Sequence, residues 1–208
     1  MGGDSRAGGI WPLHEAFYLE SMLFCTSSAL RSAAELQDAL NAGSSVEPSS
    51  REWQAAAEII LNSIQNIALQ GAALSRYFWP AREREPHTSR AHRLRRGLQV
   101  EDDSPLRDRE LRNQMEHFDE RLDLYVQDGV VGSIHPAYVG PFPGEPKVPT
   151  HLFRAYYTDQ GVFEVLGHRY KMQPIVDEIS AIHDRLRACC EAGFRIPYVS
   201  ESPSAGGA

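Results

Sequence analysis

A helical apolar period between residues 53 and 74 constrains the fold of this chain more than any other sequence feature. Apolar side chains recur there at steps of three, four or seven residues: Trp53, Ala57, Ile60, Ile64, Ile67 and Leu74. Such spacing places them on one face of an α-helix, which must be buried against other elements. Ser49 and Glu52 have capping-box spacing at the start, and Pro80 ends the helix.

Three further segments have helical patterns. The first runs from Trp11 to Leu40, and its apolar side is predicted to be Leu13, Phe17, Phe24 and Leu30. Another begins at Ser104-Pro105, an N-cap followed by proline, and runs to about Gln127. The last runs from Pro174 to near Gly193, with a predicted buried stripe of Ile175, Ile179, Ile182, Leu186 and Cys189.

The segments between these helices predict only a small amount of β-structure. Residues 152–170 contain two runs rich in aromatic and β-branched residues around a turn at 159–161, which predicts a β-hairpin. Residues 80–103 and 129–150 are predicted to be long loops, and the ends, 1–9 and 199–208, to be disordered. We therefore expect a mainly α fold over 1–208, a single domain built as a bundle of four to five helices with a small β-hairpin insertion.

Charge and cysteine content limit the classes of function. The net charge is −7, which argues against a surface made throughout for nucleic acid. Residues 80–100 nevertheless carry six arginines and two glutamates, so a local basic patch is possible. The three cysteines have no metal-binding spacing, and no apolar run approaches 18 residues. We expect a cytoplasmic protein with no membrane contact and neither metal nor cofactor.

The helix over residues 109–126 carries the most suggestive polar residues. On a helical wheel, one sector is apolar and faces the core: Leu111, Met115, Phe118, Leu122 and Tyr125. The opposite sector holds Asn113, Glu116 and Glu120. Arg112 and His117 flank this polar sector, and Asn113 and His117 are four residues apart, close enough to meet.

Arg112, Asn113 and His117 resemble the active-site motif of HEPN ribonucleases, in which an arginine and a polar residue precede a histidine on a bundle helix. The resemblance implies a metal-independent endoribonuclease that leaves a 2′,3′-cyclic phosphate. Such an enzyme would be a candidate toxin, defence factor or stress factor. His117 would act as general acid or base, and Arg112 would stabilise the phosphate in the transition state. It also implies a homodimer with a shared cleft, an RNA substrate and an antitoxin or other protein partner. Weaker substrate-binding candidates are Glu116, Arg109, Arg93, Arg95 and Arg96.

Other interpretations of the same residues stay open. The alternative is a non-catalytic HEPN-like module that binds a protein partner or a nucleotide. A third interpretation is a helical scaffold whose polar face is merely solvated. The basic segment has the composition of an exposed connecting loop as well as of an RNA guide. The aromatic residues Tyr77, Phe78 and Trp79 are suited either to stacking on bases or to packing in the core.

Overall fold

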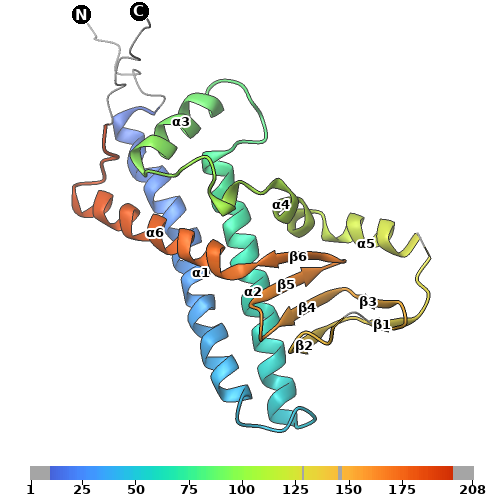
Figure 1. The fold of residues 1–208 in the computed structure, drawn as a ribbon. Helices are drawn as coiled ribbons and strands as arrows, with labels where there is room; N and C mark the ends of the chain where they lie inside the picture. The colour runs from blue at the N-terminus through green and yellow to red at the C-terminus, as the bar shows by residue number, and fades with distance from the viewer. Residues whose placement is uncertain (1–9, 128, 145–146, 199–208) are drawn as a thin grey trace, which may run out of the picture.

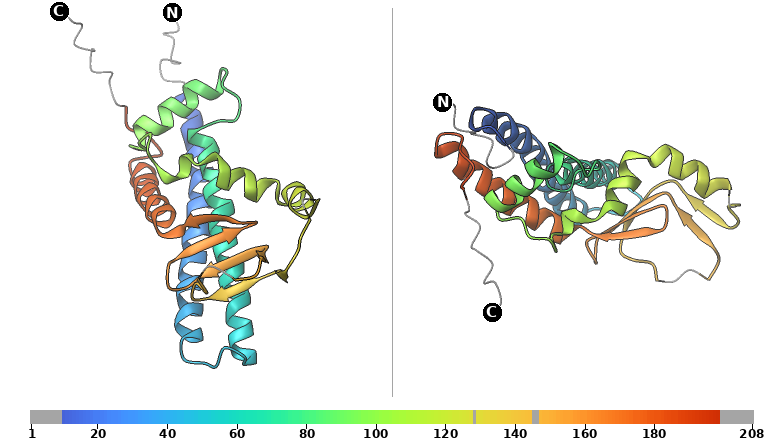
Figure 2. Two further views of the ribbon diagram at one scale, coloured as in Figure 1. Left: turned by 45° about the vertical axis from the view of Figure 1, so that its right-hand side comes forward. Right: turned by 90° about the horizontal axis from the view of Figure 1, so that it is seen from above.

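Two long antiparallel helices form the centre of the molecule (Figure 1). The computed structural model describes residues 10–127, 129–144 and 147–198, so both predicted disordered ends lie outside the described residues. Helix α1 (Glu15–Gly43) follows a short 3-10 helix (Pro12–His14), and α2 (Arg51–Phe78) packs along α1. Helix α6 (Met172–Glu191) crosses α1 and adds a second layer (Figure 2). Its buried side chains include all five that the sequence predicts.

The prediction of a mainly α fold is confirmed, although the elements outnumber those expected. The remaining helices are α3 (His87–Gly97), α4 (Arg109–Glu116) and α5 (Phe118–Gln127), with a 3-10 helix at Pro105–Arg107. No helix in the described ranges is long and apolar enough to cross a membrane.

The start of α2 shows how a local cap fixes a boundary. Ser50, in extended conformation, is the N-cap, and its side-chain oxygen accepts a hydrogen bond of 3.0 Å from the backbone N–H of Trp53. The predicted cap at Ser49 is therefore wrong by one residue. An N-cap side chain binds the N–H of the residue three positions later, and the residue three positions before Trp53 is Ser50.

The prediction of a loop over residues 80–103 is wrong, since α3 lies within it. Its buried side chains, Ala91 and Leu94, come from a single helical face surrounded by arginines, which hides the apolar period. Glu85 precedes the helix and accepts hydrogen bonds from the hydroxyls of Thr88 and Ser89, both at 2.5 Å. These bonds lower the pKa of the Glu85 carboxyl and fix the first turn.

The single helix predicted from 104 to 127 is divided. A 3-10 turn comes first, α4 ends at Glu116, and His117 leaves helical geometry at φ −122° and ψ 38° before α5 begins. The change of direction keeps α5 on the sheet, where Tyr125 hydrogen-bonds Nδ1 of His151 at 2.8 Å. The guanidinium of Arg154 lies 4.5 Å from the ring centre of Phe118. These tertiary contacts of α5 thus favour two short helices over one continuous helix.

The β-structure is larger than the predicted hairpin insertion. Strands β4 (Arg154–Tyr157) and β5 (Val162–Val165) pair antiparallel around the predicted turn, and β6 (His168–Lys171) pairs antiparallel with β5. Two strands lie in the predicted loop 129–150, β1 (Ser133–His135) and β2 (Tyr138–Gly140), and β3 (Thr150–Leu152) begins at its end. β2 pairs parallel with β4, giving the order β2-β4-β5-β6, and β1 pairs parallel with β3. Three-residue strands with distant partners leave no local sequence signal.

Candidate functional site

The side chain of Arg112 lies in the interior, against the end of α2. The residue is 8% exposed, and its Nη1 donates a 3.4 Å hydrogen bond to the carbonyl oxygen of Trp79, the C-cap residue of α2. Arg90 donates likewise to the carbonyl of Arg76, at 3.1 Å. A helix leaves its last carbonyls without intrahelical partners, and cations stabilise that end. Arg112 therefore acts as a cap for α2.

His117 has the opposite placement. Its side chain is 53% exposed at the break between α4 and α5, and Nδ1 lies 3.5 Å from the carboxylate of Glu120. Asn113 is half-buried, and its carbonyl oxygen accepts the backbone N–H of His117. Glu116 forms an ion pair of 3.3 Å with Arg76 of α2. Within one copy, the arginine of the motif thus faces inward and the histidine faces solvent.

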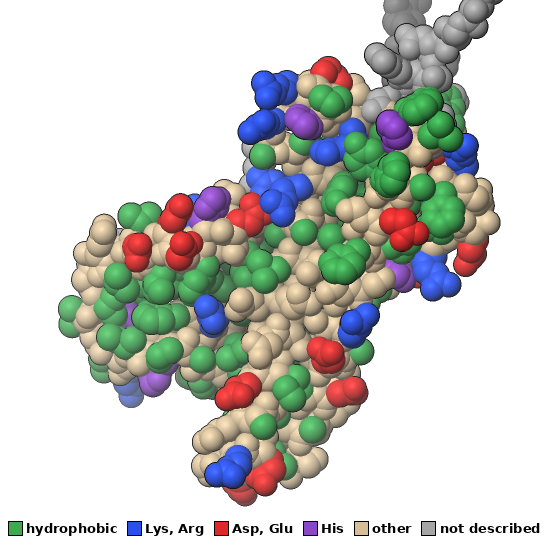
Figure 3. Space-filling view, turned by 180° about the vertical axis from the view of Figure 1, so that it is seen from behind, with side chains coloured by type: hydrophobic (Ala, Val, Ile, Leu, Met, Phe, Trp, Pro, Cys, Tyr) green, Lys and Arg blue, Asp and Glu red, His purple; other side chains and the backbone are tan. Residues whose placement is uncertain are grey.

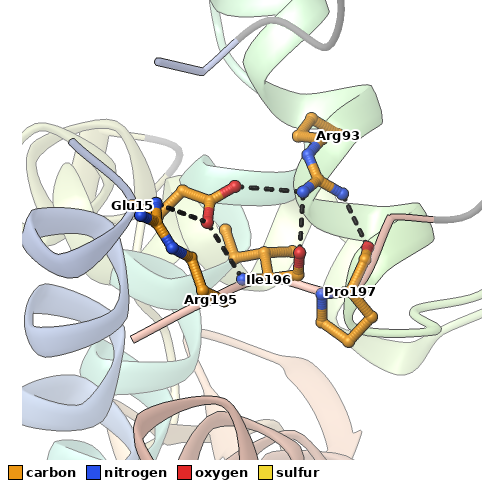
Figure 4. Close-up of polar contacts among 5 residues, drawn as sticks. All are labelled: Glu15, Arg93, Arg195, Ile196 and Pro197. Atoms are coloured by element: carbon orange, nitrogen blue, oxygen red, sulfur yellow. Dashed lines mark hydrogen bonds and ion pairs between the residues drawn. The ribbon is translucent and has the colours of Figure 1, made fainter. Parts of the chain in front are cut away.

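Arg93 is occupied by the fold, as Figure 4 shows. Its guanidinium donates to Glu15 at 3.0 Å and to the carbonyl oxygens of Ile196 and Pro197, both at 2.7 Å. Glu15 also accepts the N–H of Ile196 at 3.1 Å. The cluster joins α1, α3 and the segment after α6, so Arg93 anchors the chain end.

Of the other weak substrate-binding candidates, Arg95 is also engaged by the fold. Arg95 contacts Asp102 at 2.5 Å and lies 5.8 Å from the ring centre of Trp79. Arg96 is half-buried in α3, and the side chain of Arg109 lies outside what the structure describes. In the described ranges, no group of three or more His, Cys, Asp or Glu residues has the geometry for a metal ion.

The aromatic run at the end of α2 belongs to the core. Phe78 is fully buried and Trp79 is 6% exposed. The hydroxyl of Tyr77 contacts that of Ser21 at 2.5 Å, which ties α2 to α1. The interpretation as packing residues is therefore correct, and base stacking is not available to Phe78 and Trp79.

The outer face of α1 is the surface that the sequence prediction assigned wrongly. Phe17 and Phe24, predicted to be core residues, are 72% and 73% exposed, and Leu13 of the preceding 3-10 helix is 63% exposed. Leu30, the fourth residue of that prediction, is half-buried and packs against the core. The buried face lies opposite and contains smaller side chains: Leu19, Met22, Cys25, Thr26, Ala29, Ser32, Leu36 and Ala39. The helix is apolar on two faces, and the bulkier aromatic residues are on the outer one.

An open depression of about 350 Å³ lies on this outer face of α1. It is lined by Glu20, Leu23, Phe24, Ser27, Ser28 and Arg31. Phe17, Phe24 and Arg31 are spaced by seven residues, and Leu13, Glu20 and Ser27 repeat with the same period. Phe17 and Phe24 repeat on this stripe at the interval of a helix that packs along another helix, and the positions between and beyond them are polar: Glu20, Ser27 and Arg31. The seven-residue spacing is the sequence signal that could have identified the surface.

Hydrophobic side chains gather in two areas of the face seen in Figure 3. One lies near the chain ends, over the helical layer. The other covers the projecting lobe of α5 and the small strands, whose exposed apolar residues are Leu124, Val126, Val131, Ile134 and Val148. Exposed apolar areas of this kind are more typical of surfaces that bind protein than of catalytic surfaces.

Comparisons of the chain with protein-family models, with curated proteins and with solved structures find no match in any of the three. The roles assigned to these residues therefore depend on the geometry of this structure.

Proposed function

We propose that this chain is a non-catalytic, HEPN-like helical module that works by binding protein through the outer face of α1. The observation that carries the proposal is the exposure of Phe17 and Phe24, at 72% and 73%, beside an open depression on the same helix. Two bulky aromatic residues one heptad apart on a solvent face cost solubility unless a partner covers them.

The inward position of Arg112 supports the non-catalytic part of the proposal. A guanidinium that caps α2 is held away from solvent, whereas a phosphate-binding arginine must meet its substrate. Arg93, one of the weaker substrate-binding candidates, is held by Glu15. Two of the predicted phosphate-binding groups, Arg112 and Arg93, are thus already used within the fold, whereas Arg82 and Arg84 before α3 are exposed.

The proposal is tested by the size of the assembly that contains the chain in extracts of its native cell. The variant Phe24→Glu removes the central aromatic residue, and Ile59→Glu is the matched control, because Ile59 is 48% exposed on α2. We expect the wild type and Ile59→Glu to migrate above the 23.3 kDa monomer, and Phe24→Glu to migrate as a monomer. Identical migration of Phe24→Glu and wild type would contradict the proposal.

A metal-independent endoribonuclease is the second candidate, and one observation favours it. The imidazole of His117 is exposed, and Glu120 contacts its Nδ1, which leaves Nε2 as the nitrogen that would exchange a proton with RNA. In this candidate, Arg112 of a second copy would have to supply the cation.

Cleavage of bulk RNA in EDTA, comparing wild type with His117→Ala, separates the two candidates. The ribonuclease requires cleavage by the wild type, with 2′,3′-cyclic phosphate ends, and its loss in His117→Ala. The binding module predicts that both proteins are inert. Equal activity of the two would trace the cleavage to a contaminant and remove the ribonuclease.

A further inference from the structure

We infer that the partner on the outer face of α1 is a second copy of this chain, whose α1 packs antiparallel about a two-fold axis passing between Cys25 and Thr26. The inference rests on the proposed function, since it names the protein that the same surface binds. The outer stripe of α1 has two interleaved series of heptad positions. Phe17, Phe24 and Arg31 form one, and Glu20, Ser27 and Ala34 form the other.

With a two-fold axis between Cys25 and Thr26, each residue faces the residue of the second copy that lies at the same distance on the other side of the axis. Phe24 then faces Ser27, and Phe17 faces Ala34, so each bulky ring meets a small side chain. Phe24 also enters the depression that Ser27 and Ser28 line, in both directions of the symmetric pair. Large residues facing small ones are what close helix packing requires.

The same axis matches opposite charges. Glu20 and Arg31 are both exposed, both line the depression, and neither forms an ion pair with another residue of the described ranges. In the two-fold arrangement, Glu20 of each copy faces Arg31 of the other, which gives two ion pairs on either side of the aromatic centre.

Neighbouring registers lack this match. Moving the axis to Phe24 places Phe24 against Phe24 and leaves Glu20 opposite Ser28. Moving it to lie between Ser27 and Ser28 places Glu20 opposite Glu35, two like charges. Charge repulsion and aromatic crowding therefore favour a single register.

The expected dimer is of moderate strength. One helix face from each copy buries an area near the lower end of specific interfaces, roughly 1,200 Å² in total, a size typical of weak and transient complexes. We therefore expect a dissociation constant on the order of micromolar. Helix α4 packs on α2, so this dimer does not require the two copies of His117 to meet.

The test is sedimentation equilibrium of the purified full-length chain over about 1 to 200 µM, a range that brackets a micromolar constant. We expect a monomer–dimer equilibrium for the wild type and for Ile59→Glu. Phe24→Glu should weaken it by about 30-fold or more, as expected for a central aromatic residue. Circular dichroism checks that each variant is folded.

Charge reversal tests the register. Glu20→Arg and Arg31→Glu each place like charges together twice in the dimer, so each variant alone should be monomeric. An equimolar mixture of the two restores opposite charges at both contacts and should form a heterodimer, and the double variant should form a homodimer.

Three results would overturn the inference: a monomeric wild type over the whole range, a dimer unaffected by Phe24→Glu, or a mixture of the two charge variants that stays monomeric. A monomeric purified chain that still forms a Phe24-dependent assembly in cell extract would overturn only this inference. If the purified chain is monomeric and no Phe24-dependent assembly forms in cell extract, the proposed function is overturned as well.

Discussion

The ion pair between Glu15 and Arg93 provides the sharpest test of the structural role assigned to a predicted RNA-binding arginine. The Glu15 side chain is 5% exposed, that of Arg93 is 11% exposed, and their N–O distance is 3.0 Å. The variant Glu15→Ala leaves the guanidinium buried with two carbonyl acceptors and no carboxylate, and it removes the acceptor of the Ile196 N–H. Breaking one side of a buried pair costs about 3–5 kcal/mol of unfolding free energy.

The reverse variant should cost less. In Arg93→Ala, Glu15 keeps the Ile196 N–H and lies 3.9 Å from Arg195, so we expect a loss of about 2–3 kcal/mol. The double variant should cost less than the sum of the two single losses, with a coupling energy of about 1–3 kcal/mol. Urea unfolding followed by circular dichroism measures all four proteins. A Glu15→Ala variant within about 1 kcal/mol of wild type would refute the reasoning, because a buried guanidinium that has lost its carboxylate partner destabilises the fold by more than that.

Three further predictions test separate parts of the structure. Ser50→Ala should lower the unfolding free energy by about 1 kcal/mol through loss of the α2 cap, whereas Ser49→Ala should have almost no effect, and equal effects in urea unfolding would contradict the assignment. Arg112→Ala should cost about 1–2 kcal/mol as a lost cap for the α2 carbonyl, while exposed His117→Ala should stay within about 0.5 kcal/mol of wild type, and a reversed order would contradict the inward and outward placements. Burial and the Glu164 carboxylate raise the pKa of Tyr157 from 10.0 to about 12. Because its folded pKa lies above its unfolded value, Tyr157 stabilises the fold fully below about pH 10 and loses that contribution towards pH 12. Thermal melts between those values should therefore show a shallower decline for Tyr157→Phe than for wild type, and parallel curves would contradict the assignment.

The elements predicted best are those whose burial is decided by one helical face. The stripe of α6 follows the sequence because Ile175, Ile179 and Ile182 have no competing apolar face. α1 was assigned the wrong face for the opposite reason. It packs on α2 through small and polar residues such as Ala29 and Ser32, so the periodicity of its large side chains indicates the outer surface.

Elements whose partners are distant in sequence could not be predicted locally. The β1 strand is paired with β3 across 17 residues, as in Ser133 with Thr150, and three residues alone do not specify such pairing. The role of Arg93 could not be predicted for the same reason, since its partner Glu15 lies 78 residues earlier in the sequence. A basic segment identifies available cations, but it does not identify which of them the fold already uses.

The most direct test of the central claim, that the outer face of α1 binds protein, is a site-specific photo-crosslink from position 24. A benzophenone amino acid replaces Phe24 in the full-length chain, and the same replacement at Ile59 of α2 is the control, since both side chains are exposed. We predict a covalent adduct at position 24 that joins two copies of the chain, with the attached peptide containing Ser27 and Ser28. Equal adducts at both positions, or none at position 24, would contradict the account.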